Sequence, residues 1–539
     1  MTKNRSESNV ISLSANGPGG VGDVGKLYLH RLRHWHGQSI LRPCLDRTSA
    51  VRSAEHQVHH EEITMMHTVN GYATTQAKTM TGAQRAGIIM TLACFLMLVS
   101  SAGAQVTLLY NFGTHAGDPA HPNYPGFVVQ GRDGNLYSTS NDGGTDNAGT
   151  VFKITPAGQV SVLYSFDGVT GALPSSGLTL GTDGNFYGTT FENGPSNYGT
   201  IFKITAQGKL TLLHGFDDSD GAAPWGAAVE GTDGAFYGTT EDGGSANCGT
   251  VYRVTAGGTF KTLYTFDGTY GCQPLAPLVL GNDGNFYGTA LTGGNNPALG
   301  AIFKITPAGA ITLLHSFDGT HGFSPYAPLM QASDGNFYGT TVNGGNNEGV
   351  VFKVSPSGVF TDLHDFDLSQ DGGEPFSALV QGTNGVLYGT TAYGGAFNVG
   401  TIYSVPLGSG NLNALYSFDV TSGSAPGAAL TQHTNGSFYG DSAWGGSDNL
   451  GTLYSFNLGL SPFVRLVTTS AKVGKTVQIL GQGFTGTTAV SFHGKAATFH
   501  VVSNTYLTAL VPNGATSGFV TVATPGRVLK SNQVFRVIP

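Results

Sequence analysis

The chain has 539 residues and a formal net charge of −8, and 82 of its residues are glycine. A chain of this length is too long for one ordinary hydrophobic core, and its 10% aromatic content excludes a wholly disordered protein. The glycine content, about twice the average, and the low charged fraction of 11% favour many short strands joined by tight turns.

The first part of the chain contains two segments that we expect to lie outside the folded protein. Residues 1–79 are polar and aperiodic, which indicates a disordered segment or a start codon assigned too early, with Met65 or Met80 as the true start. Residues 80–104 have the pattern of a signal peptide, because an apolar stretch is followed by a small-residue cleavage site. We therefore predict a secreted or cell-surface protein, and the alternative is a retained membrane anchor.

One motif, DGNFYGTT at residues 183–190, organises the rest of the chain and returns in varied form over residues 105–459. Its tyrosine recurs at steps of 50 or 51 residues. The seven positions are Tyr137, Tyr187, Tyr237, Tyr287, Tyr338, Tyr388 and Tyr439. A fixed period near fifty residues predicts a repeat architecture in which these tyrosines are structural.

Each complete repeat divides into four segments of strand length. In one repeat these are residues 177–181, 185–190, 199–205 and 209–216, and Asp183-Gly184 forms a typical two-residue hairpin turn between the first two. Four antiparallel strands in about fifty residues correspond to one blade of a β-propeller.

The two ends of the repeat region predict how a ring would close. Residues 106–112 align with the fourth strands of other repeats, whereas residues 451–456 are a third strand after which the pattern stops. The N-terminal strand should therefore complete the last sheet and leave no free sheet edge. We predict an all-β protein with a seven-bladed β-propeller over residues 105–459.

The submotifs DGNFYGTT, GTIFKIT and LLHGFD recur in this order and resemble the tandem repeats of bacterial choice-of-anchor GloVer-repeat proteins. This resemblance implies a secreted or cell-surface bacterial protein of unassigned biochemistry that is attached by variable C-terminal devices. The Gly-Gly pairs, such as Gly243-Gly244, resemble kelch propellers more loosely.

Residues 463–539 show a different pattern of short alternating strands. The sequence KTVQILGQG at 475–483, followed by Phe484, resembles the IPT/TIG immunoglobulin-like domain, which implies a small β-sandwich. This segment carries seven basic and no acidic residues, whereas residues 105–462 carry 27 acidic and eight basic ones, a net charge of −19. We expect the basic segment either to dock on the acidic propeller or to contact acidic polymers. Nucleic acid is not expected, because the signal peptide places the chain outside the cell and the charges form no stripe.

Ligand binding is expected on the face that carries the loops after the second and fourth strands. Aromatic rings there can stack on sugar rings, and neighbouring carboxylates and amides can bind sugar hydroxyls. The candidate ligand-binding residues are Trp225, Tyr326, Phe376, Tyr393, Trp444, Asp142, Asp242 and Asn343. The alternative is that these rings fill gaps between blades.

A second set of polar residues stands near the end of the innermost strand and is predicted to line an axial channel. Its members are Gln130, Glu230, Gln331, Gln381 and Gln432. Glu230 is the one candidate acid among these amides, and no partner carboxylate for glycoside hydrolysis is evident.

Cys248 and Cys272 fall in two loops on the same face that border one blade. We expect a disulfide between them in an oxidising compartment, and the alternative is two thiols too far apart to bridge.

No cofactor is expected. Aspartates such as Asp167 and Asp267 follow the fourth-strand phenylalanine and are predicted to hold turns, with bound calcium as the alternative. The histidines at fourth-strand positions are interpreted as packing residues, and they are His214, His315 and His364.

We therefore predict a non-enzymatic, monomeric binding or adhesion scaffold whose partner is an extracellular glycan or a surface protein. The alternative is an extracellular polysaccharide-active lyase or hydrolase. A copper oxidase is less favoured: the propeller and Ig-like layout resembles galactose-oxidase-type enzymes, but the nearest Cys–Tyr pair, Cys272 and Tyr270, falls in an outer loop.

Overall fold

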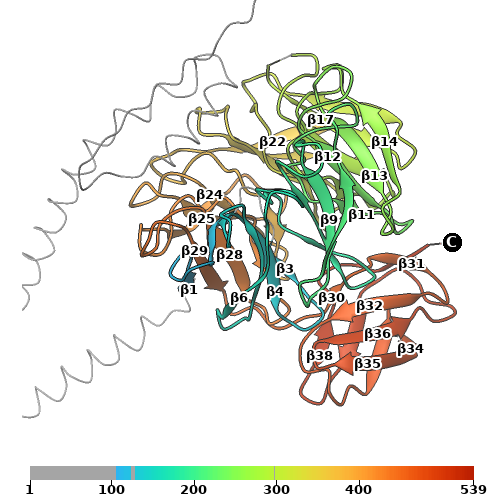
Figure 1. Cartoon of the computed structure of the whole chain (residues 1–539). Coiled ribbons are helices and arrows are strands. Elements are labelled where there is room, and N and C mark those ends of the chain that lie inside the picture. The colour runs from blue at the N-terminus through green and yellow to red at the C-terminus, as the bar shows by residue number, and fades with distance from the viewer. Residues whose placement is uncertain (1–104, 123–127, 297, 539) are drawn as a thin grey trace, which may run out of the picture. The chain divides into compact units, whose positions relative to one another are not determined.

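The computed structural model describes residues 105–122, 128–296 and 298–538. The elements of this part of the chain are all β-strands, and most belong to four-stranded antiparallel sheets (Figure 1). No helix in these ranges has the length and apolar character of a membrane crossing. The predicted upstream segment (1–79) and signal peptide (80–104) lie outside the described residues.

Residues 105–457 form seven sheets, which we call sheets 1 to 7 in chain order. Sheet 1 contains β2 (Pro119–Pro122), β3 (Val129–Gln130), β4 (Leu136–Gly143), β5 (Thr150–Ile154) and β6 (Val160–Ser165). Sheet 2 contains β7 (Thr179–Leu180), β8 (Phe186–Thr190), β9 (Thr200–Ile204) and β10 (Leu210–Gly215). Sheet 3 contains β11 (Val229–Glu230), β12 (Phe236–Thr240), β13 (Thr250–Val254) and β14 (Phe260–Thr265).

The later sheets repeat this pattern. Sheet 4 contains β15 (Val279–Leu280), β16 (Phe286–Ala290), β17 (Ala301–Ile305) and β18 (Ile311–Ser316). Sheet 5 contains β19 (Met330–Gln331), β20 (Phe337–Thr341), β21 (Val350–Val354) and β22 (Phe360–Asp365). Sheet 6 contains β23 (Val380–Gln381), β24 (Leu387–Thr391), β25 (Thr401–Val405) and β26 (Asn413–Ser417). Sheet 7 contains β27 (Thr431–Gln432), β28 (Phe438–Ser442), β29 (Thr452–Asn457) and β1 (Gln105–Asn111).

The N-terminal strand completes the last sheet, as predicted. β1 pairs antiparallel with β29, with Val106 opposite Phe456 and Asn111 opposite Thr452, and both strands lie together in Figure 1. The all-β prediction is confirmed. The seven sheets correspond in sequence to the seven predicted blades. That they form a seven-bladed propeller stays a prediction.

Hydrophobic clusters lie between neighbouring sheets and not within single ones. One cluster joins Tyr137 of sheet 1 to Phe186 of sheet 2, and equivalent clusters join each following pair of sheets. A seventh cluster contains Tyr439 and Leu453 of sheet 7 together with Leu136 of sheet 1. The sheets are therefore connected in a closed cycle of apolar contacts.

The repeat tyrosine links the hairpin turn to the next sheet. The hydroxyl of Tyr187 donates to Asp183 in the turn at 2.8 Å, and the ring stacks on Phe236 of the next sheet at 3.6 Å. Asp183 also accepts the backbone N–H of Asn185 at 3.0 Å, while Gly184 supplies the positive φ of the turn. The tyrosine is fully buried, which agrees with its predicted structural role.

Strand bounds agree with the sequence prediction within one or two residues. The first strand is the shortest, since β7 covers only Thr179–Leu180 of the predicted 177–181. The extra strand β2 in sheet 1 was not predicted, and it pairs with the end of β4.

The terminal domain, residues 463–538, is a β-sandwich as predicted. One sheet has the order β30 (Arg465–Leu466), β32 (Thr476–Leu480), β36 (Tyr506–Leu510) and β35 (Phe499–Ser503). The other has the order β34 (Lys495–Ala497), β33 (Ala489–Phe492), β37 (Val520–Ala523) and β38 (Val528–Lys530). A parallel pair, β31 (Ser470–Lys472) and β39 (Arg536–Ile538), adds to them, and one apolar core fills the sandwich.

The terminal domain contacts the repeat sheets through hydrogen bonds, in which Arg132 of the repeats and Arg465 of the terminal domain take part. The Arg132 side chain of sheet 1 donates to the Gln478 side chain at 2.7 Å, and the Arg132 carbonyl accepts a hydrogen bond from the Thr505 hydroxyl at 2.7 Å. The amide of Gln482 donates to Thr434 beside sheet 7 at 3.0 Å. No ion pair joins the terminal domain to the repeat sheets among the described residues, but two arginines of the terminal domain lie at this contact. Arg465 donates to the carbonyl of Gln432 at 2.6 Å, and the charge of Asp283 opposes the lowering of the Arg536 pKa by burial.

Candidate functional site

The loop after the second strand pairs with the loop before the first strand in every repeat. In sheet 3, for example, Ala222 and Asp242 exchange two backbone hydrogen bonds of 2.8 and 3.1 Å. The equivalent positions are Asp142, Glu192, Asp242, Thr292, Asn343, Tyr393 and Trp444. Five of the eight predicted ligand-binding residues therefore stand on one backbone frame, which presents six different residue types over the seven repeats.

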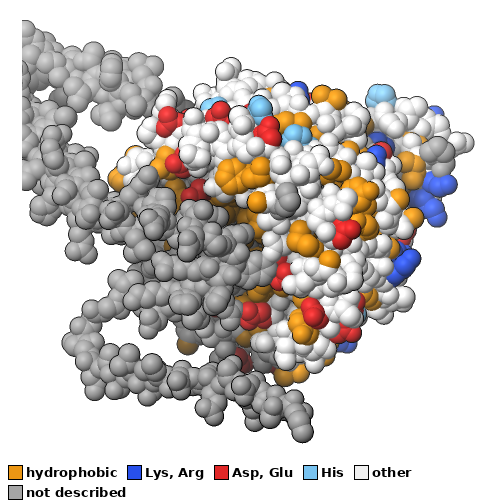
Figure 2. Space-filling model, turned by 90° about the horizontal axis from the view of Figure 1, so that it is seen from above, with side chains coloured by type: hydrophobic (Ala, Val, Ile, Leu, Met, Phe, Trp, Pro, Cys, Tyr) orange, Lys and Arg blue, Asp and Glu red, His pale blue; other side chains and the backbone are white. Residues whose placement is uncertain are grey.

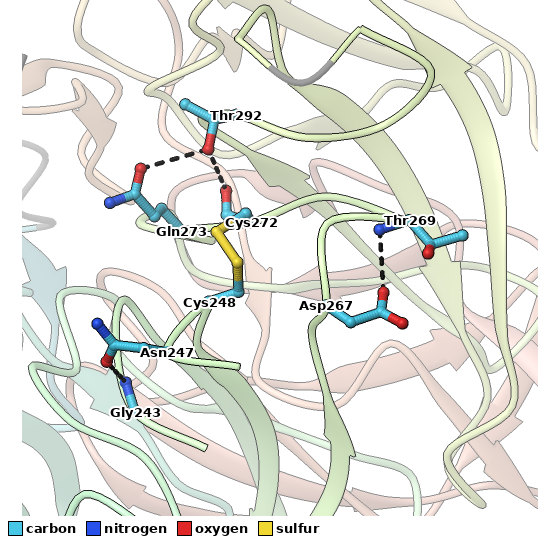
Figure 3. The surroundings of a disulfide bond; sticks show 8 residues. All are labelled: Gly243, Asn247, Cys248, Asp267, Thr269, Cys272, Gln273 and Thr292. Atoms are coloured by element: carbon cyan, nitrogen blue, oxygen red, sulfur yellow. Dashed lines mark hydrogen bonds between the residues drawn. A yellow bond between two sulfur atoms is a disulfide. The ribbon is translucent and has the colours of Figure 1, made fainter. Parts of the chain in front are cut away.

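A disulfide ties two of these loops together. The structure joins Cys248, after β12, to Cys272, before β15, with their Cα atoms 4.6 Å apart (Figure 3). Cys272 also pairs through its backbone with Thr292 of the following sheet. Sheets 3 and 4 are thus covalently linked on the loop face.

Trp225 fills space between sheets 2 and 3. Its ring centroid lies 4.8 Å from that of Phe191, and its Nε1–H donates to the carboxylate of Glu241. Burial, and then the charge of Asp242, raise the pKa of Glu241 to about 8, although the bond from Trp225 lowers it. Trp225 therefore fills a gap between two sheets, which is the alternative to ligand binding given above for these rings.

Trp444 also has protein neighbours. Its ring lies 4.4 Å from the ring of His121, whose Nδ1 is 3.0 Å from the carboxylate of Asp142. This cluster brings together two predicted site residues from sheets 7 and 1. The sequence did not single out His121.

Aromatic side chains at sheets 5 and 6 are more accessible. The rings of Tyr326 and Phe376 meet edge to face at 5.2 Å. On the loop after β24, Tyr393 is 37% exposed and Phe397 is 60% exposed. Phe397 was missed in the sequence, where its only signal is an aromatic residue soon after the Gly394-Gly395 pair.

Two further carboxyl groups on the loop face hold protons more tightly than usual. Burial, with the charge of Asp218, raises the pKa of Asp242 to about 6. Burial, with the charge of Glu348, raises the pKa of Glu374 to about 7. The sequence did not identify Glu241 and Glu374 as site residues, because their partners, Trp225 and Glu348, lie outside the sequence motif that contains each glutamate.

The predicted channel residues connect neighbouring sheets. Each accepts the backbone N–H of a residue two positions beyond the first strand of the preceding sheet. The pairs are Gln130 with Thr434 (3.0 Å), Glu230 with Thr182 (2.8 Å), Gln331 with Asn282 (2.8 Å), Gln381 with Ser333 (2.9 Å) and Gln432 with Thr383 (3.0 Å). Sheets 2 and 4 carry Leu180 and Leu280 at this position. The pairs hold the ring together, and a channel lined by them stays a prediction.

Two metal alternatives concern the turn aspartates and the Cys–Tyr pair. The described ranges contain no group of three or more His, Cys, Asp or Glu side chains placed to hold a metal ion. Asp167 accepts the backbone N–H of Val169 at 2.9 Å, as expected for a turn residue. The Cys–Tyr pair of a copper oxidase does not fit either, because the sulfur of Cys272 is bonded to Cys248.

Two of the three fourth-strand histidines stack on phenylalanine rings, and one of these, His214, also bonds Asp220 at 2.8 Å. His214 and His315 stack on Phe260 and Phe360 with ring centroids 3.6 and 3.9 Å apart. His364 instead bonds Asp371 at 2.8 Å.

Solved structures with low similarity share a broad likeness with the chain. A gluconolactonase from Xanthomonas campestris is 13% identical, with a TM-score of 0.36, over 65% of this chain and 99% of its own. A fungal alcohol oxidase in complex with copper is 13% identical, with a TM-score of 0.44, over 80% of this chain and all of its own (100%). These values say nothing about activity.

Family models match most of the sequence, whereas no curated protein matches it. The Gloeobacter/Verrucomicrobia repeat matches residues 61–230, 124–327, 177–403 and 273–498, and the IPT/TIG domain matches residues 462–536. Both matches agree with the resemblances drawn from the repeat submotifs and from residues 475–484. The chain therefore belongs to the Gloeobacter/Verrucomicrobia repeat family and carries an IPT/TIG domain after the repeats.

Proposed function

We propose that the chain is a secreted or surface-held binding scaffold without enzymatic activity, and that it takes a carbohydrate on the loop face of sheets 5 and 6. The supporting observation is the exposed pair Tyr393 and Phe397 on one loop. Exposed large apolar side chains on a rigid loop are a common sign of a binding surface.

The frame beneath these rings is fixed. Tyr393 and Gly373 exchange two backbone hydrogen bonds, of 3.1 and 3.2 Å, and Phe376 follows three residues later with its ring against Tyr326. Rings that are held in place before binding lose little conformational freedom when they stack on a ligand. Trp225 and Trp444 are less suitable, because both side chains are more buried than that of Tyr393.

The proposal is tested by measuring binding of the full chain to immobilised neutral polysaccharides. A Tyr393→Ala, Phe397→Ala double variant should bind about tenfold more weakly, since each aromatic stacking contact contributes about 0.5–1.5 kcal/mol. Tyr198→Ala is the matched control, because Tyr198 is a 41% exposed aromatic on the same kind of loop in sheet 2. Equal binding by the double variant and the wild-type chain would refute the proposed surface.

One observation favours a second function, hydrolysis of a polysaccharide at the same place. Glu374 has a pKa raised to about 7 by burial and then by the charge of Glu348, and a carboxyl group that is protonated near neutral pH can act as a general acid. Hydrolysis predicts release of reducing ends that a Glu374→Gln variant abolishes while it keeps its polysaccharide affinity. Absence of reducing ends with the wild-type chain would leave binding as the function.

A further inference from the structure

The terminal domain exposes basic side chains that nothing in the described chain neutralises. Residues 463–539 contain seven basic and no acidic residues. Five of the basic side chains are exposed, and no ion pair within the described ranges involves them: Lys472, Lys475, Lys495, Arg527 and Lys530. Figure 2 shows Lys and Arg gathered towards one edge of the visible face, with Asp and Glu spread over the rest.

Three of these lysines meet at one end of the sandwich. Lys472 and Lys475 close a turn through a backbone bond of 3.2 Å. The carbonyl of Lys475 accepts the N–H of Val511 at 2.9 Å, which places this turn beside the segment after β36. The Nζ of Lys495 lies about 4.0 Å from where a Cβ on Gly514, in the same segment, would stand.

Lys530 extends over the second sheet towards the same end. Its Nζ lies 3.7 Å from the ring centroid of Phe519. The carbonyl of Phe519 accepts the N–H of His493 at 2.9 Å, and His493 is two residues before Lys495. We call Lys472, Lys475, Lys495 and Lys530 the basic end.

Three of the four lysines of the basic end lie at the end of the sandwich opposite the contacts with sheets 7 and 1. β32 and β36 are antiparallel, with Thr476 opposite Leu510 at the basic end and Leu480 opposite Tyr506 at the other. The residues that bond sheets 1 and 7 at the ends of these strands, Thr505 and Gln482, adjoin that other end. Lys472, Lys475 and Lys495 therefore lie away from this contact. The carbonyl of Lys530 accepts the N–H of Val464 at 3.1 Å, but the Lys530 side chain is exposed.

We propose that the basic end binds an acidic polysaccharide, so that the terminal domain attaches the chain to an anionic extracellular matrix. Four cations without an ion pair in the described ranges complement a repeating carboxylated chain. Phe519 adds a ring, and Ser491 and Thr521 add hydroxyl groups on the outer face of the same sheet. The choice of partner rests on the proposed extracellular location, but the binding itself does not.

An anionic membrane fits this surface less well. Surfaces that insert into membranes present protruding Trp, Phe or Leu side chains. The apolar residues at the basic end, Val473, Leu510 and Phe519, are each less than half exposed (45%, 41% and 38%), and the Lys530 ammonium group lies over the Phe519 ring.

Affinity electrophoresis of the full chain in gels that contain alginate, a polymer of uronic acids, tests the proposal. A Lys475→Gln, Lys495→Gln, Lys530→Gln variant should bind alginate at least about tenfold more weakly at about 50 mM NaCl, and raising the salt to about 200 mM should weaken the wild-type chain more than the variant. The matched control removes three exposed cations elsewhere: Arg527→Gln at the opposite end of β37 and β38, with Lys209→Gln and Lys261→Gln in the repeats.

The control variant should lose less than about twofold in affinity, because its cations lie outside the basic end. Equal losses in both variants, or equal retardation by alginate and neutral dextran, would overturn the proposal. Binding to vesicles that contain phosphatidylglycerol without binding to alginate would also overturn it, in favour of a membrane. The Tyr393→Ala, Phe397→Ala variant should bind alginate like the wild-type chain, which separates this site from the proposed carbohydrate face.

Discussion

Three buried tyrosine hydroxyl groups make the sharpest stability prediction. Tyr252, Tyr403 and Tyr454 occupy the third-strand position that is phenylalanine in the other four repeats. Each is fully buried, and its hydroxyl has no hydrogen-bond partner within the described residues. Burial without a partner costs about 1–3 kcal/mol for such a group. Tyr252→Phe should therefore raise the free energy of unfolding by about 1 kcal/mol.

Tyr187→Phe is the matched control, because it removes the same atom from a hydroxyl that is bonded. Tyr187 donates to the Asp183 carboxylate at 2.8 Å, and Asp183 keeps its bonds from Asn185 when the hydroxyl is lost. A hydrogen bond to a charged group contributes about 1.5–3 kcal/mol. Tyr187→Phe should therefore lower the free energy of unfolding by about 1.5 kcal/mol, so the two variants differ by roughly 2.5 kcal/mol.

Urea unfolding followed by tryptophan fluorescence and by near-ultraviolet circular dichroism measures both effects. Tyr252, Tyr403 and Tyr454 belong to three separate hydrophobic clusters, so their three substitutions should add to about 3 kcal/mol. A Tyr252→Phe variant that loses as much stability as Tyr187→Phe would refute the reasoning, because it would show that the Tyr252 hydroxyl is satisfied.

Two more changes test other features of the repeat sheets. Asp441 replaces the threonine found at this position in the other six repeats, and burial raises its pKa to about 8 from 3.8. Between about pH 4 and pH 8 the folded state holds a proton that the unfolded chain releases, so the free energy of unfolding falls as the pH rises through this range. Asp441→Thr should reduce this fall by several kcal/mol when unfolding is measured at pH 5 and at pH 8. An unchanged pH dependence of the free energy of unfolding would contradict the prediction. The Cys248–Cys272 disulfide closes a loop with a sequence separation of 24, for which chain entropy gives about 3.5 kcal/mol. Cys248→Ala with Cys272→Ala should lower the urea midpoint accordingly and make it insensitive to dithiothreitol, whereas a reductant-insensitive wild-type chain would argue against the bond.

The sequence was informative wherever a residue acts through the repeat itself. Tyr187 and Asp183 lie four residues apart, and their contact returns with the motif, so strands, turns and the completion of sheet 7 by β1 followed from spacing alone. The partners of Trp225 did not follow in this way. Phe191 comes from the preceding sheet and Glu241 from a loop sixteen residues on, and only the packing of sheets brings them together.

The amides at the end of the first strand show a second limit. Gln381 was read as a channel residue because its position is inner and polar. Its carbonyl oxygen accepts the N–H of Ser333, 48 residues earlier, and this bond depends on how neighbouring sheets are offset. An offset between sheets leaves no periodic trace in one sequence, so this bonding was not predictable.

The pairing of β1 with β29 has a consequence for how such chains can change over evolutionary time. A linear stack could gain one duplicated unit at either tip and leave its older units untouched. In a repeat array whose first strand completes the last sheet, a duplicated repeat must instead be inserted between existing ones, and the angle between every pair of neighbouring sheets must change slightly. New recognition properties are therefore expected to arise mainly by rewriting loops such as the one that carries Tyr393 and Phe397, while the circumference stays constant.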